Sequence, residues 1–339
     1  MAKPRILIVR DAAIGDVIMI TPSIRYWSER GWWVDVVTKP QVGGAVLANN
    51  PHVNARLHLG KCESMEDRGK AIARLAKKHP YRHVLDLAGT CEGLYLFHSI
   101  TREYYWTKEQ RRAIAAGENY YQTCNKYAGM PQDSPDIYRP ELYPSPIEER
   151  KWTQFRADNL GAPIVMVQLA GSSINKAYPF WPEVVKGLHA MHPRLICILT
   201  GGPEAVLLEA AVMESGAGCR RTMCTAQSEN WSLRTSLIAT KYADLVIGPE
   251  TGVINASACF DTHKIPLLTH STADNLCRGW RNCYPIQSPA HCSPCYKIVS
   301  ACDKCNHKNT GTDLDAALLC MASIPPGEIL KKAKEALKL

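Results

Sequence analysis

The sequence predicts an α/β protein built from two doubly wound parallel sheets. Short apolar runs alternate with longer amphipathic stretches over the first 130 residues, and the same rhythm restarts after residue 150. Five prolines between residues 131 and 146 interrupt it. Such alternation is typical of a parallel sheet with helices on both faces. Each half is therefore expected to form one sheet with its own helical layers.

Three short runs rich in Val, Ile and Leu predict strands in the first half, at 6–9, 34–37 and 83–87. Helices are predicted between them wherever apolar residues recur at helical spacing. These helices lie at 16–30 and 66–78.

The second half repeats this organisation. Four further apolar runs predict strands, each separated from the next by a loop and a helical pattern. They lie at 164–167, 195–199, 245–247 and 265–268.

The domain boundaries follow from these patterns. We expect a first Rossmann-like domain at 1–130 and a Pro-rich linker at 131–150, because so many prolines exclude a regular element there. A second Rossmann-like domain at 151–325 carries a cysteine-rich loop at 283–320. A final helix is expected at 326–339.

The composition is that of an ordinary globular protein with an excess of basic residues. Hydrophobic residues make up 46% and charged residues 21% of the 339 positions, which excludes disordered, collagen-like and coiled-coil proteins. The net charge of +8 fits an enzyme that handles anionic ligands such as nucleotides. It leaves nucleic acid open as a second partner.

The expected location follows from the absence of two patterns. Neither a cleavable leader nor an apolar run near the ~20 residues of a membrane helix is found. We therefore expect a cytoplasmic protein with no transmembrane segment. Its 14 cysteines are then more readily thiols or metal ligands than disulfides, because the cytosol keeps thiols reduced.

A carboxylate follows the first predicted strand. Asp16 comes after Gly15, at or near the start of the next helix, where a negative charge is favoured. One interpretation is that Asp16 only caps this helix. The other is that it acts as a general base, because the carboxyl end of a strand faces the ligand cleft of such folds.

The first loop of the second half has the composition of a phosphate site. Gly171, Ser172, Ser173 and Lys176 follow the strand at 164–167. Backbone N–H groups and Ser hydroxyls donate hydrogen bonds to phosphate, and Lys supplies positive charge. The alternative is a Ser-rich surface loop with one solvated lysine.

Two more glycine-containing loops follow strands of the second half. Gly201 and Gly202 come after one strand, and Glu250, Thr251 and Gly252 come after another. Glycines at strand ends are often only turns. Three such loops in one half nevertheless favour a nucleotide site.

Two C-x-x-C pairs lie near the end of the chain. Cys292, Cys295, Cys302 and Cys305 supply four thiols, enough for one tetrahedral ion, and we expect a structural zinc. Unligated packing cysteines or disulfides are the alternatives, because the spacer between the pairs is shorter than in zinc ribbons.

These motifs together resemble glycosyltransferase family 9, the heptosyltransferases of lipopolysaccharide core assembly and their relatives. The match follows order and position along nearly the whole chain. Divergent relatives of this family also occur in bacteriophages. The matching segments are 6–10, 15–17, 21–22, 171–176, 199–202, 250–252, 292–295 and 320–325.

The resemblance implies a GT-B fold of two Rossmann-like domains, the first holding the acceptor and the second the nucleotide sugar. It implies an inverting transfer without a catalytic metal ion, in which Asp16 takes the proton of the acceptor hydroxyl. The groups that would stabilise the leaving diphosphate are Ser172, Ser173, Lys176, Thr251 and Gly252.

The chain departs from the family pattern at its donor motif. The family usually has Asp-Thr-Gly-x-x-His, whereas this chain has Glu250 at the first position and Asn255 at the last. A heptose donor therefore does not carry over from the resemblance.

Three functions are consistent with these residues. The first is transfer of a sugar from a nucleotide-diphosphate sugar to a saccharide such as lipopolysaccharide core. The second is transfer to a modified nucleic-acid base. The third is a non-catalytic sugar-nucleotide-binding protein, in which Glu250 and Asn255 mark lost activity.

Overall fold

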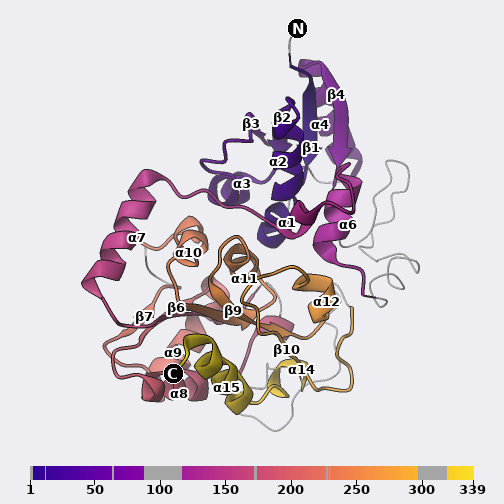
Figure 1. Cartoon of the computed structure of the whole chain (residues 1–339). Helices are drawn as coiled ribbons and strands as arrows, with labels where there is room; N and C mark the ends of the chain where they lie inside the picture. Colours follow the sequence, from indigo (N-terminus) through magenta and orange to yellow (C-terminus); the bar gives the residue numbers. More distant parts are fainter. Residues whose placement is uncertain are drawn as a thin grey trace. The chain divides into compact units, whose positions relative to one another are not determined.

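The computed structural model describes residues 3–11, 13–62, 65–87, 117–171, 174–226, 228, 230–296 and 319–339. The chain divides into two compact units, Met1–Pro144 and Ser145–Leu339. This boundary falls inside the predicted linker. Each unit contains a parallel sheet with helices packed on it (Figure 1). The predicted α/β architecture of two doubly wound parallel sheets is confirmed.

The first unit has a four-stranded sheet in the order β3-β2-β1-β4, with every neighbouring pair parallel. From β1 the chain steps outward through β2 and β3, and it then returns to the other side of β1 with β4. The strands are β1 (Arg5–Val9), β2 (Trp33–Val37), β3 (Ala55–Leu57) and β4 (Tyr81–Asp86).

Both faces of this sheet are covered, because side chains of a strand alternate between faces and those of β1 are buried after its first residue. Leu7 and Val9 form a cluster with Ile72 of α4. The helices are α1 (Ile14–Met19), α2 (Thr21–Glu29), α3 (Pro40–Val46), α4 (Met65–Lys78), α6 (Tyr120–Tyr127) and the 3-10 turn η1 (Pro135–Tyr138).

One predicted helix is divided in two. The sequence predicts a single helix at 16–30, whereas α1 ends at Met19 and α2 begins at Thr21. Pro22 lies in the first turn of α2, where its missing N–H needs no partner. The Thr21 hydroxyl donates to Ile18 O (2.8 Å) and accepts the N–H of Glu141 (2.8 Å). At the break, the Thr21 hydroxyl thus connects α1 with Glu141, which lies near the end of this unit.

The second unit has a six-stranded parallel sheet in the order β10-β9-β8-β5-β6-β7. Its strand order also reverses once, between β5 and β8. The strands are β5 (Ile164–Gln168), β6 (Ile196–Thr200), β7 (Thr222–Cys224), β8 (Leu245–Pro249), β9 (His263–Leu268) and β10 (Ile286–Gln287).

Helices lie on both faces of the second sheet, with α8, α9 and α15 on one side and α10 and α11 on the other (Figure 1). In the described ranges no helix is long and apolar enough to cross a membrane. The helices and 3-10 turns are α7 (Pro146–Asp158), η2 (Ile174–Lys176), α8 (Trp181–Met191), η3 (Pro203–Ala205), α9 (Val206–Glu214), α10 (Leu233–Ala239), α11 (Gly252–Ser257), α12 (Ala273–Leu276), α14 (Leu319–Ala322) and α15 (Pro326–Leu337).

Candidate functional site

Two loops of the second unit meet where its strand order reverses. Open parallel sheets bind ligands at the carboxyl ends of the strands on either side of such a reversal. The loop after β5 carries Gly171 and Lys176, and the loop after β8 carries Glu250 and Thr251. The structure therefore places four predicted donor-binding residues at the expected position in the sheet.

Gly171 allows these two loops to approach one another. A Cβ at this position would lie 2.8 Å from Cδ of Lys176 and 2.9 Å from Cγ2 of Thr251. Both distances are shorter than real Cβ contacts, so a larger residue would force both side chains, or the loop itself, to shift. Gly171, Lys176 and Thr251 therefore form one cluster, and Thr251 is the residue at which α11 begins.

The Thr251 hydroxyl in this cluster is available for a ligand. Its Oγ1 is buried and has no hydrogen-bond partner among the described residues. Thr251 is the N-cap residue of α11, yet its side chain does not cap the helix. Buried hydroxyls are nearly always hydrogen-bonded, so this group is an expected contact for a bound molecule.

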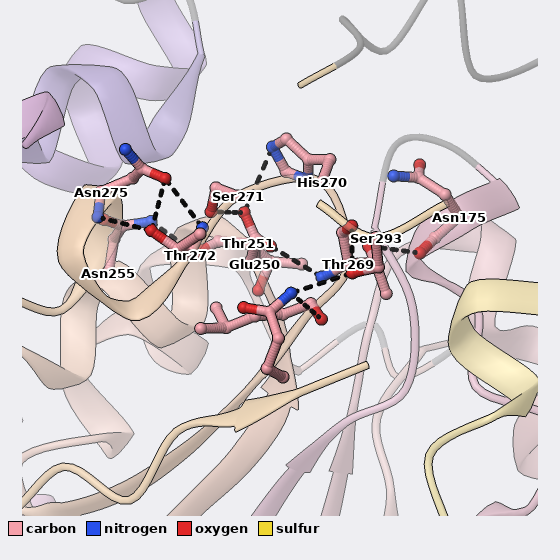
Figure 2. A network of polar contacts seen from close by, with 12 residues as sticks. Asn175, Glu250, Thr251, Asn255, Thr269, His270, Ser271, Thr272, Asn275 and Ser293 are labelled. Carbon is pink, nitrogen blue, oxygen red and sulfur yellow. Dashed lines mark hydrogen bonds and ion pairs between the residues drawn. The ribbon is translucent and has the colours of Figure 1, made fainter. Parts of the chain in front are cut away.

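Glu250 organises the next strand-end loop (Figure 2). Its carboxylate accepts the N–H of Thr269 (3.1 Å) and the hydroxyl of Ser271 (2.7 Å), and it lies 3.2 Å from Nε2 of His270. The side chain is only 5% exposed. The Glu250 carboxylate is therefore engaged by groups of the protein. It would influence a ligand indirectly, by holding the loop at 269–271 in place.

His270 is a site residue that the sequence analysis did not select. Its Nε2 faces Glu250, whereas its Nδ1 is buried without a partner in the described part of the chain. Burial lowers the pKa of His270, Glu250 opposes this effect, and Lys176 adds to the lowering. The available sequence signal was its position two residues after the apolar run at 265–268.

The first C-x-x-C pair lies against this same loop. The Ser293 hydroxyl donates to Thr269 O (2.9 Å), and Tyr296 N donates to His270 O (2.9 Å). Cys292 packs against Cys320. Among the described residues no group of three or more metal-ligating side chains is found. Of the predicted ligands, Cys292 and Cys295 are described, and Cys302 and Cys305 lie outside the described residues.

The remaining predicted donor residues are placed as follows. Gly202 N donates to Oε1 of Glu204 (3.1 Å) within the loop after β6, and a Cβ on Gly201 would collide with Ala205 of that loop. No described contact joins these two glycines to Lys176. Gly252 begins α11. Ser172 and Ser173 lie outside the described residues.

In the first unit, Asp16 is held at the corresponding reversal of strand order. Its Oδ2 lies 2.6 Å from Nη2 of Arg10 and accepts the N–H of Ala13 (2.7 Å). Arg10 follows β1 and is buried, and its Nη1 donates to Leu87 O just after β4 (2.9 Å). Arg10 therefore spans β1 and β4 and fixes the direction of the Asp16 carboxylate, which remains 16% exposed.

A second arginine crosses the same strand ends. Arg68 of α4 binds Asp86 at the end of β4, and its Nε lies 3.2 Å from Oδ2 of Asp11 after β1. In the sequence, Arg68 begins a run of basic residues without an acid, which could meet an anionic acceptor but is most simply the solvated face of a helix. The simpler interpretation is wrong for Arg68, which is buried between two carboxylates that raise its pKa despite burial.

Comparison with known proteins tests the resemblance. No family model and no curated protein matches the sequence. Solved structures do match over the whole length. A glycosyltransferase of family 9 from Veillonella parvula has a TM-score of 0.71 at 13% identity, covering 100% of this chain and 99% of the other. The chain has the glycosyltransferase family 9 fold.

Two further structures support this assignment of the fold. E. coli ADP-heptose lipopolysaccharide heptosyltransferase II has a TM-score of 0.68 at 14% identity, with 98% of both chains covered. TibC, an iron-containing dodecameric glycosyltransferase from enterotoxigenic E. coli, has a TM-score of 0.61 at 12% identity, covering 99% of this chain and 79% of TibC. The expected resemblance to glycosyltransferase family 9 is thus confirmed at the level of the fold. That fold is GT-B, as the resemblance implied.

Proposed function

We propose that this protein is a metal-independent, inverting glycosyltransferase that uses a nucleotide-diphosphate sugar. The observation that carries the proposal is the cluster of Gly171, Lys176 and Thr251 at the reversal of strand order in the second sheet. A lysine charge, a buried hydroxyl without a described partner and a close backbone approach are the features that a diphosphate requires.

The donor would be held by residues of three strand-end loops. Lys176 would pair with the diphosphate, and Thr251 would donate its hydroxyl to it. His270, placed by Glu250, would contact the same ligand through Nδ1. Such groups stabilise the charge that develops on the leaving diphosphate. From the sequence, Ser172, Ser173, Gly201, Gly202 and Gly252 are proposed as further donor contacts.

Asp16 is proposed as the general base. It would take the proton of an acceptor hydroxyl as that oxygen attacks the anomeric carbon, and the bond from that carbon to the diphosphate would break on the opposite side. Arg10 supports this role because it holds the carboxylate in one direction without closing it off from solvent. A saccharide such as lipopolysaccharide core is the proposed acceptor and the cytoplasm the proposed location.

The first experiment measures thermal unfolding with ADP, GDP, UDP and their sugar conjugates. A ligand present at 100 times its dissociation constant stabilises a protein by about 2.7 kcal/mol. We expect one nucleotide to raise the unfolding temperature more than the others. If none does at millimolar concentration, the donor site is refuted.

Transfer is then measured with the donor so identified and a panel of acceptors. Asp16→Asn is expected to lower turnover by about 10²–10⁴-fold while donor binding is retained. Donor binding without turnover by the unmodified protein on saccharides or modified nucleic acid would support the non-catalytic alternative. Turnover on modified nucleic acid would instead support the alternative in which a modified nucleic-acid base is the acceptor.

For the cysteine-rich loop we propose one structural metal ion per chain, bound by Cys292, Cys295, Cys302 and Cys305. The proposal is supported by the hydrogen bonds that fix Ser293, between the two cysteines of the first pair, and Tyr296, directly after the pair. Zinc is the expected ion, and iron is the alternative because TibC contains it. Elemental analysis of protein purified without added metal tests the proposal, and a substoichiometric content of both metals would refute it.

A further inference from the structure

The connections that lead into the strands of the first sheet meet at its amino-terminal edge. Parallel strands all begin at the same edge, so Arg5 of β1, Trp33 of β2 and Tyr81 of β4 lie side by side there. The helices α2 and α4 also end at this edge, because each is followed directly by a strand of the sheet. Residues that are distant in the chain thus form one surface.

This edge is basic. Its exposed cations are Lys3, Arg30, Lys77, Lys78 and Arg82, and none of them forms an ion pair with another described residue. Of the described acidic residues in these connections, Glu29 is exposed. Asp35 is buried and lies 3.2 Å from Nη2 of Arg5. The edge therefore carries an excess of positive charge that its carboxylates do not neutralise.

Two tryptophans border these cations. Trp32 packs against Trp27 and His83, with ring centroids 5.0 and 5.1 Å away. Trp33 is 43% exposed, and the Arg5 guanidinium lies 5.3 Å from its ring centroid. No described group accepts a hydrogen bond from the indole N–H of Trp32 or Trp33, and neither N–H is buried. Both indoles are therefore available to an acceptor outside the chain.

Charge and aromatic character together indicate the kind of partner. Clustered basic residues attract the anionic headgroups of a bilayer. Tryptophan is enriched at the depth of these headgroups, because its ring is apolar and its N–H needs an acceptor. Long basic side chains also place apolar stems against such a surface.

Single-stranded nucleic acid carries the same charge, but its sites combine a basic groove with rings on which bases stack. Here Arg5 already lies over the Trp33 ring. The cations come from the starts of three strands rather than from one groove. This arrangement favours a flat anionic partner.

We propose that the amino-terminal edge of the first sheet is a docking surface for an anionic lipid bilayer. The exposed cations pair with headgroup phosphates, and the indoles of Trp32 and Trp33 enter the headgroup layer. The surface does not depend on the proposed transferase activity, because Asp16 follows β1 at the opposite edge of the same sheet.

Sedimentation of the full-length protein with lipid vesicles tests this surface. Vesicles of phosphatidylglycerol mixed with phosphatidylcholine are the anionic probe, and vesicles of phosphatidylcholine alone are the neutral one. We expect about tenfold or more tighter binding to the anionic vesicles, and a loss of binding as salt is raised, because salt screens exposed charges. Equal binding to the two kinds of vesicle, or binding to neither, would overturn the proposal.

Two double variants of equal net charge separate this edge from the general positive charge of the chain. Lys77→Gln with Lys78→Gln removes two cations of the edge and should weaken binding to the anionic vesicles about tenfold or more. Lys331→Gln with Lys334→Gln removes two exposed cations of α15 and should leave binding within about twofold of the unmodified protein. Equal losses in the two double variants would overturn the proposal.

Trp33→Ala tests the contribution of the indole. It should weaken binding to the anionic vesicles several-fold, whereas Leu160→Ala, which truncates an exposed apolar side chain of the second unit, should not. Unfolding temperatures establish that the variants are folded. Unaltered binding by folded Trp33→Ala would overturn the proposal. A single-stranded oligonucleotide bound more tightly than the vesicles, with the same loss in the Lys77 and Lys78 double variant, would assign the edge to nucleic acid instead.

Discussion

His270 and Glu250 lie on successive strand-end loops of the second sheet, with Nε2 of the imidazole 3.2 Å from Oε2 of the carboxylate. The pair leaves Nδ1 of His270 buried without a partner among the described residues. Burial lowers the pKa of His270, and the charge of Lys176 adds to this effect. Glu250 was predicted as a donor-binding residue from the sequence, whereas His270 was not.

The first prediction is that His270→Phe weakens binding of the preferred nucleoside diphosphate about tenfold, which is the loss expected for one hydrogen bond to a buried ligand. Isothermal titration calorimetry measures the dissociation constant. The matched control is Ser271→Ala, which removes one hydrogen bond to Glu250 but leaves the ring in place. A smaller effect is expected there. Affinity within twofold of the unmodified protein in folded His270→Phe would contradict the prediction.

Gly171→Ala provides a second prediction. The new Cβ would force Lys176 and Thr251, or the loop itself, to shift, because it would lie under 3.0 Å from an atom of each residue. Nucleotide affinity is expected to fall about tenfold or more, as when one good charged hydrogen bond is lost. The control is Gly327→Ala in α15, where a Cβ meets no atom within 4 Å. That variant should bind normally and gain about 0.5–1 kcal/mol in stability.

The strands β5, β6 and β8 were predictable from the sequence because each is a short apolar run whose residues are buried on both faces. Lys176 and Thr251 were predictable because ligand loops follow such strands. The strands β3, β7 and β10 were missed, because each has only two or three residues and is not an apolar run. The division between α1 and α2 was missed because the apolar periodicity continues through Ile20. Periodicity alone does not reveal that a new helix begins at Thr21, with Pro22 in its first turn.

Burial of charged side chains was the least predictable feature. Arg68 lies in a helix among other basic residues, a pattern typical of a solvated face. Its partners, Asp11 and Asp86, are 57 and 18 residues away in the chain. Only the parallel pairing of β1 with β4 brings these two carboxylates together. His270 was missed for a similar reason, because its importance depends on contact with Glu250.

Arg68→Met tests the importance of this buried cation. Removing it leaves the Asp11 and Asp86 carboxylates close together without their shared partner. We expect the free energy of unfolding to fall by about 3–5 kcal/mol, as is typical when one partner of a buried ion pair is removed. Urea unfolding measures the change. Arg74→Met, on an exposed position of the same helix, should change stability by no more than about 0.5 kcal/mol. Similar changes in the free energy of unfolding for the two substitutions would show that the ion pairs of Arg68 with Asp11 and Asp86 do not stabilise the fold.

The last prediction concerns acid stability at the start of the second unit. Glu148 of α7 pairs with Arg234 of α10 (2.8 and 3.0 Å) and accepts the N–H of Ser145 (2.6 Å). Burial opposes the charged form, but these contacts outweigh it and lower the pKa of Glu148 from 4.5 to about 2. The unfolded chain therefore binds more protons at this position between these two pH values. The stability that the pair contributes is present above pH 4.5 and is lost as the pH falls towards 2.

Glu148→Gln should accordingly lower the free energy of unfolding by about 1–2 kcal/mol at pH 7, a value reduced for partial exposure to solvent. The difference from the unmodified protein should narrow at pH 3, because the charge of Glu148 contributes less there. Urea unfolding at both pH values measures it. Glu149→Gln is the control, since Glu149 pairs with Lys241 on a more exposed surface, and its effect should be smaller. A Glu148→Gln difference that is constant from pH 7 to pH 3 would mean that its hydrogen bonds, rather than its charge, connect α7 with α10.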